Sequence, residues 1–478
     1  MGHHIIKEVK QEKFEFTGRA KLVAIGLFVV GTILAIVGAM DVQEHWDDPI
    51  DKVETSSESD AHAEEAHEDH HATLAQHDDG HGGTHSEETQ DAHASEKHSE
   101  VDTHTDSHGP TWMSRVWANL LLNSYYFWLF AVGAIFFIAV NYVANAGWAV
   151  MLKRIMEAQS SYLIIGSILL VGILWGAKDT LYHWSQYFNS ADAGNPGSPG
   201  YDTILESKSW LLNNGSIFFF IPFVLLVWIG IRWKLRSNSK AEDETEGLSM
   251  FRNSSRWSAG FIFFFAFSFS ALSWLIIMSI DAHWYSTMFS IYNFAISFVT
   301  SLSVMMLILQ YLKSKGYMEM VSDEVVHDLG KFMFAFCLFW GYIFLSQWLL
   351  IWYTNLPEET IYFDARLTDQ FKPLFFINLF MCFLAPFLVL MMRNAKRAPQ
   401  VLLLAAAIIL IGHWVDMYLL IMPGAVGVKS DIGMLEIGTT MAFAGIFIYT
   451  VLNSLSRANM YPVNHPYFLE SVNHDVGP

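Results

Sequence analysis

The chain has 478 residues, of which 53% are apolar and 15% aromatic, and its mean hydropathy is +0.29. This composition excludes an ordinary soluble enzyme. The formal net charge of −19 excludes a nucleic-acid-binding protein. Two cysteines, without a C-x-x-C-H motif or a cysteine cluster, leave no ligands for covalent haem or an iron–sulfur cluster in this chain.

Ten apolar runs, most of them of bilayer length, alternate with short polar segments. A helix needs about 20 apolar residues to cross a bilayer, and in lipid the backbone must satisfy its own hydrogen bonds. We therefore predict an all-α integral membrane protein with ten transmembrane helices. The runs are 22–40, 120–144, 160–175, 210–233, 257–280, 289–312, 332–353, 373–392, 401–421 and 432–455.

Basic residues are distributed unevenly between the two sides of the predicted membrane. Of the 28 Lys and Arg residues, 20 fall in the segments that share a side with the N-terminus, and 8 fall on the other side. Because cytoplasmic loops carry the excess of Lys and Arg, this asymmetry places both termini in the cytoplasm.

One outer segment, 41–110, holds 21 of the 47 acids and 12 of the 20 histidines. It has too few apolar residues to fold alone, and we interpret it as a disordered, solvated periplasmic loop rather than a metal scavenger. A weak similarity between spans two to five and spans six to nine predicts two four-helix bundles, 111–285 and 286–425. Residues 1–40 and 426–478 then supply two peripheral helices with cytoplasmic ends. Pro386 is expected to kink the eighth span.

The deepest ionisable pair lies in the ninth span, where His413 and Asp416 are three residues apart and share a helix face. Ionisable groups inside a membrane are costly unless paired or hydrated, so each is a functional candidate. We interpret this pair as a proton-handling site, with a buried structural pair as the alternative. His413 is the only histidine well inside a span, so the bis-histidine ligation of haem b is not expected.

Other polar candidates lie near the outer ends of spans. An acid close to an imidazole can pass protons near neutral pH, whereas the same pairs could be exposed caps or turn-forming loops. The proton-path candidates of this kind are Asp179 with His183, Asp281 with His283, Glu358 with Glu359, and Glu436. Lys208, Gln347 and Asn355 are candidates for an interface or a quinone contact. No residue is predicted to be catalytic or to bind a metal.

Five segments carry a resemblance to a known family: LYHW (181–184), KSWLLN (208–213), SIDAHWYSTMF (279–289), LLIWYTNLPEET (349–360) and GHWVDMYLLIMP (412–423). They resemble the polysulfide-reductase-type (NrfD-like) membrane subunits of respiratory complexes, in particular the F subunit of alternative complex III. That complex is a quinol:cytochrome c oxidoreductase. The resemblance covers spans two to ten.

The resemblance implies a multi-pass subunit of the bacterial inner membrane that supports quinol oxidation and proton conduction. It implies a sister NrfD-like C subunit, and multihaem cytochrome c and iron–sulfur subunits that hold the haem c and the clusters. Quinol or menaquinol is the implied substrate, oxidised mainly in the sister. The C-type subunit shares several motifs, so it stays open as an alternative, and a secondary transporter is the rival class.

Overall fold

The computed structural model describes residues 13–47, 110–245 and 247–474. The predicted acidic loop at 41–110 therefore lies, apart from its margins, outside the described residues. The described chain is helical, and ten of its helical segments are long and apolar enough to cross a membrane, as predicted from hydropathy. They are α2 (Gly18–Glu44), α3 (Trp112–Val143), η1–α4–α5 (Trp148–Leu181), η2–α8 (Ser216–Glu244), α9–η3 (Ser249–Ile280), α10 (Phe289–Ser314), α11 (Asp323–Thr354), α13–η4–α14 (Lys372–Leu390), α15 (Pro399–Ala425) and α16 (Met434–Leu455).

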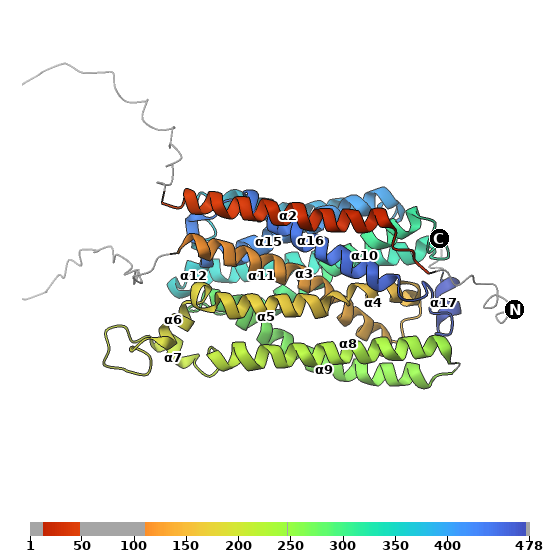
Figure 1. Cartoon of the computed structure of the whole chain (residues 1–478), viewed down its shortest axis with the longest axis horizontal. Coiled ribbons are helices and arrows are strands. Elements are labelled where there is room, and N and C mark those ends of the chain that lie inside the picture. The colour runs from red at the N-terminus through yellow and green to blue at the C-terminus, as the bar shows by residue number, and fades with distance from the viewer. Residues whose placement is uncertain (1–12, 48–109, 246, 475–478) are drawn as a thin grey trace, which may run out of the picture. The chain divides into compact units, whose positions relative to one another are not determined.

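In the described part of the chain four short α-helices lie outside the spans: α6 (His183–Asn189), α7 (Thr203–Ser207), α12 (Pro357–Asp364) and α17 (Phe468–Val472). The 3₁₀ helices η5 (Ala395–Arg397) and η6 (Gly427–Lys429) also lie outside them. Figure 1 shows α17 at one end of the helices and α6, α7 and α12 at the other. We call these the tail end and the far end. The tail end carries the end of α8 and the start of α9, the loop at 315–322 and the segment 456–474. The far end carries the segments 182–215, 277–288, 355–371 and 426–433.

The third span begins earlier than predicted, because charged residues at its start are buried. Lys153 donates to Glu242 at 2.6 Å, and Arg154 donates to Glu157 at 2.9 Å and also pairs with Asp243. Buried charges are tolerated where they are paired and hydrogen-bonded. Hydropathy alone counted these residues as loop.

Two helices form the centre of the packed helices. α3 contacts α5, α9, α10, α15 and α16, and α10 contacts α3, α9, α11 and α15. Most residues of both helices are buried, which fits apolar helices with neighbours on several sides. α8 packs on α9, and α2 lies along α16 (Figure 1).

Glycines allow α2 and α16 to approach closely. A Cβ atom on Gly31 would lie 2.4 Å from the Ala442 nitrogen, and one on Gly38 would lie 2.3 Å from a backbone nitrogen of α16. Gly438 and Gly445 meet the α2 backbone in the same way. Small residues at such a seam let helix backbones touch in the membrane. Almost all of the other side chains of α2 are exposed or half-buried.

Two spans contain a π-helical turn. The eighth span is α13 (Lys372–Leu379), the turn η4 (Phe380–Leu384) and α14 (Ala385–Leu390). The fourth span begins with the turn η2 (Ser216–Phe220) before α8 (Ile221–Glu244). Such turns occur frequently at functional sites. The irregularity expected at Pro386 thus precedes the proline.

Candidate functional site

The side chain of Asp416 lies in the interior of the helices and is 2% exposed. Its Oδ1 accepts hydrogen bonds from the Tyr292 hydroxyl of α10 and from Asn378 Nδ2 of α13, the latter at 2.9 Å. Its Oδ2 accepts one from Trp340 Nε1 of α11 at 3.1 Å. Four helices therefore converge on one carboxyl group, and both of its oxygens have donors.

His413, one turn earlier on α15, contacts a different partner. Its Nδ1 lies 2.8 Å from the Cys382 Sγ, and that thiol lies 3.0 Å from Asn378 Oδ1. Within the described residues His413 Nε2 is buried without a hydrogen-bond partner. Asn378 thus links the two residues, which share a helix but are not bonded to each other. We call Tyr292, Trp340, Asn378, Cys382, His413 and Asp416 the Asp416 cluster.

A cavity of about 30 Å³ adjoins this cluster on the side of the far end. Asp416, Tyr292 and Asn378 line one part of it, and Gln347 and Arg366 line another. A buried water needs about 15 Å³ of such space, so there is room for about two. Waters at this position would connect the buried carboxyl group with Arg366.

Arg366 lies just after α12 and is 3% exposed. Its Nη2 donates to Asp281 Oδ2 at 2.9 Å, and its other bonds go to the carbonyl oxygens of Tyr362, Leu419 and Leu420. Its guanidinium lies 3.4 Å from the centroid of the Tyr362 ring. Asp281 is a quarter exposed, so this ion pair joins the cavity to the far-end surface.

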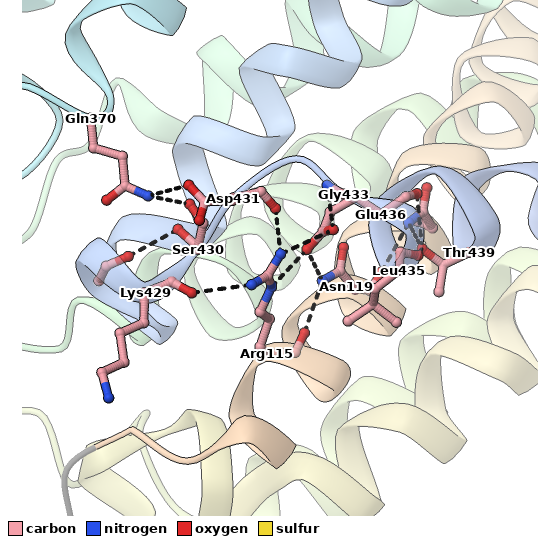
Figure 2. A network of polar contacts seen from close by, with 12 residues as sticks. Arg115, Asn119, Gln370, Lys429, Ser430, Asp431, Gly433, Leu435, Glu436 and Thr439 are labelled. Carbon is pink, nitrogen blue, oxygen red and sulfur yellow. Dashed lines mark hydrogen bonds and ion pairs between the residues drawn. The ribbon is translucent and has the colours of Figure 1, made fainter. Parts of the chain in front are cut away.

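Glu436 belongs to a separate network at the far end, shown in Figure 2. Arg115 Nε donates to Glu436 Oε1 at 2.9 Å, and Asn119 Nδ2 donates to the same oxygen at 2.9 Å. The Gly433 N–H donates to Oε2 at 2.9 Å, and Arg115 also donates to the carbonyl oxygen of Asp431 at 2.6 Å. Both carboxylate oxygens of Glu436 are bonded to partners on α3 or at the start of α16, so this acid joins the two helices, and it does not line the cavity beside Asp416.

The pairs predicted at the end of the third span and after the fifth are arranged differently in the structure. Helix α5 ends at Leu181, and α6 begins at His183, so Asp179 and His183 do not share one continuous helix. Asp179 instead accepts hydrogen bonds from Lys178 at 2.6 Å and Ser185 at 2.8 Å.

His283 pairs with Asp202 through Nε2 at 2.5 Å, and not with Asp281. Desolvation raises the pKa of Asp202, but the backbone N–H groups of α7 and the contact with His283 outweigh it, so the net pKa is lowered. The ring of His183 lies 5.9 Å from that of His283. The outer histidines therefore gather near Asp202, away from the cavity beside Asp416.

The remaining candidates are dispersed. Lys208 Nζ donates to the carbonyl oxygen of Ala282 at 2.6 Å, and Asn355 ends α11 in a left-handed conformation. Glu358 is exposed and Glu359 half-buried, both in the first turn of α12. Of these candidates only Gln347, described above, reaches the cavity.

Several partners of the cluster could not be read from the sequence. Tyr292, Trp340 and Asn378 are distant from Asp416 in the chain, and each lies in an apolar run where it gives no local signal. Arg366 was missed because it lies in a polar loop, although an arginine beside a short helix rich in acids and aromatics was a usable signal. Within the described ranges no three His, Cys, Asp or Glu residues gather as a metal site would need.

Comparison of the chain with models of protein families and with curated proteins found no match.

Proposed function

We propose that this chain is an F-type, NrfD-like membrane subunit of alternative complex III, a respiratory quinol:cytochrome c oxidoreductase of the bacterial inner membrane. The resemblance of five long segments on spans two to ten supports the family. In this proposal the chain holds no redox centre. Electrons pass through the haem c and iron–sulfur clusters of partner subunits, and quinol or menaquinol is oxidised mainly in the sister C subunit.

The proposed arrangement is two four-helix bundles, spans two to five and spans six to nine, with α2 and α16 outside them. Contacts between α3 and α5, α3 and α9, and α8 and α9 support the first bundle. Contacts of α10 with α11 and α15, and of α15 with the eighth span, support the second. The central pair α3 and α10 would join the two bundles.

We propose that the tail end faces the cytoplasm, on the basis of the basic residues that gather in its segments. Cys337 and Cys382 are both buried, so an impermeant thiol reagent should not label either of these native cysteines. Asn195→Cys at the far end should be labelled from outside intact spheroplasts. Ser314→Cys at the tail end should be labelled only after permeabilisation, and the reverse pattern would overturn the orientation.

The proposed role of the chain is to conduct protons through its second bundle to the far end. One observation carries this role: the buried, fully hydrogen-bonded Asp416 borders a cavity that Arg366 also lines, and Arg366 is paired with Asp281 outside that cavity. Burial disfavours the charged form of a carboxyl group whereas hydrogen bonds to its oxygens favour that form, so the two protonation states lie closer in free energy and a proton can be exchanged when water reaches the group. The path then runs from Asp416 through water to the Arg366–Asp281 pair and the outer surface.

Asp416→Asn in the assembled complex tests this role, because it removes the charge and keeps the shape. The new asparagine, however, places its NH2 group against Trp340 Nε1, and two donors then face each other. The double variant Asp416→Asn/Trp340→Phe removes the indole N–H group and with it this repulsion. Trp340→Phe alone keeps the carboxyl group and loses one donor. Glu436→Gln is the matched control, a buried acid outside the cavity.

Each electron taken from quinol leaves one proton to be conducted away, so we expect both Asp416 variants to slow turnover together with proton release at the far end, whereas Trp340→Phe and Glu436→Gln retain the wild-type rates. Proton release is measured with a pH dye beside quinol:cytochrome c turnover in liposomes. Wild-type proton release in the double variant would refute the proton role and leave a structural cluster. Copurification of multihaem and iron–sulfur subunits tests the family assignment itself, and its absence would contradict it.

A further inference from the structure

A second cavity lies at the far end of the first bundle, between α9–η3 and the segment that precedes η2. It measures about 60 Å³, twice the volume of the cavity beside Asp416. By the same measure it has room for about four waters. Lys208, Trp210, Trp274, Ser279 and Trp284 contribute its polar and aromatic walls.

Two of the tryptophans that line this cavity have an indole N–H group without an acceptor among the described residues. Trp274 Nε1 and Trp284 Nε1 are both buried and have no acceptor in the described part of the chain. Trp284 as a whole is only 6% exposed. An indole N–H can only donate, and buried donors are rarely left unpaired in native proteins. The Ser279 hydroxyl already donates to the Leu275 carbonyl oxygen at 2.6 Å.

Lys208 adds positive charge to the same walls. Its Nζ donates to the carbonyl oxygens of Ala282 at 2.6 Å, His283 at 3.4 Å and Trp284 at 3.5 Å, and it lies 5.4 Å from the centroid of the exposed Tyr285 ring. Burial lowers the pKa of Lys208, and the nearby Asp202 carboxylate opposes that shift. Asp202 itself is occupied by His283 and by the N–H groups that start α7. The carbonyl oxygens that Lys208 contacts are neutral, so no lining residue offsets its charge, and the two indole N–H groups lack acceptors in the described part of the chain.

We propose that this cavity binds the phosphate group of a membrane phospholipid. A phosphodiester supplies the missing negative charge and only acceptor oxygens, which suits one ammonium and two indole N–H groups. Trp210 at the rim is 75% exposed and Tyr285 is 64% exposed. Exposed Trp and Tyr lie at the headgroup level of membranes, which is where lipid phosphates lie and soluble anions are dilute. The site does not depend on the respiratory assignment.

The test compares full-length wild-type protein with Trp274→Phe/Trp284→Phe, which removes both N–H groups and keeps the rings. The Trp284 ring stacks on Tyr362 at 3.8 Å, and phenylalanine retains that contact. Trp352→Phe is the matched control, an exposed far-end tryptophan outside the cavity. Lys208 is left unchanged because it holds the backbone after η3.

Native mass spectrometry measures binding of phosphatidylglycerol, of diacylglycerol without phosphate, of inorganic phosphate and of menaquinone. We expect one tightly retained phosphatidylglycerol in the wild type and in Trp352→Phe, and about tenfold weaker binding for each lost N–H. If the double variant fails to fold, Trp274→Phe alone should show the tenfold loss.

Equal phosphatidylglycerol binding by wild type and the indole variants would overturn the proposal. So would equal retention of diacylglycerol, binding of inorganic phosphate without the lipid, or occupation of the site by menaquinone alone.

Discussion

The glycine seam between α2 and α16 yields a prediction that separates close packing from helix propensity. Gly31→Ala adds one Cβ atom 2.4 Å from the Ala442 nitrogen, whereas Gly26→Ala, on the same helix, adds one with no neighbour within 4 Å. Both substitutions gain about 1 kcal/mol of helix propensity. Only Gly31→Ala overpacks the seam. The atoms that its new Cβ would meet belong to the backbone of α16, which cannot move aside by changing a rotamer.

The expected difference in stability between the two variants follows from the distances at the seam. Ordinary contact begins at 3.4 Å, so α2 must shift outward by about 1 Å along a seam where few of its other residues are buried. A gap of that size removes a quarter to a half of each dispersion contact, and overpacking costs about 1–3 kcal/mol. We therefore expect Gly31→Ala to be less stable than Gly26→Ala by about 1–3 kcal/mol.

Thermal unfolding in detergent, followed by tryptophan fluorescence, measures the difference between the two variants. A disulfide between cysteines introduced in α2 and α16 reports whether the helices remain in register. Equal melting of the two variants, with unchanged cross-linking, would refute the argument that the helices approach as closely as the glycines allow.

Two further predictions concern charge. Arg115→Met leaves the buried Glu436 carboxylate without its cation and should cost about 3–5 kcal/mol in the same assay, with part recovered when Glu436→Gln is added. His465, in the tail, has its pKa lowered to about 2 by burial and by Lys153 and Arg154. Its unfolded pKa is about 6.5, so the unfolded state binds the extra proton and stability falls below pH 6.5, by about 2 kcal/mol at pH 5. His465→Gln should flatten that part of the stability–pH curve, and an unchanged slope would contradict the assignment.

Hydropathy predicted the ten spans because the bilayer imposes the same length and apolarity on every crossing. It also predicted that His413 and Asp416 are buried, because both lie inside the apolar run 401–421. It did not identify what they bind, because Tyr292, Trp340 and Asn378 come from three other helices. Such partners depend on how helices rotate and pack, and helix packing in lipid is specified by small contacts spread over many residues.

Local spacing proved less reliable at the ends of helices. The four-residue spacing of Asp179 and His183 predicts a shared face only if the helix continues, and it ends at Leu181. Asp281 and His283, two residues apart in the sequence, have separate partners because the connection after η3 is irregular there. The partners of a loop residue depend on which residues lie near it in the folded chain, and the hydrophobic periodicity of the sequence does not contain that information.

The π-helical turn η4 sets the angular phase of the eighth span. A π-helical turn holds about one residue more than an α-helical turn, so η4 absorbs that extra residue, and α13 and α14 keep nearly the phase of one regular helix. Asn378 of α13 therefore contacts Asp416, and Cys382 within the turn contacts His413 on the same neighbouring helix. The lipid-facing surface of α14 is consequently free to change in sequence without altering the amide on which the buried carboxyl group depends, as long as the length of this segment is kept.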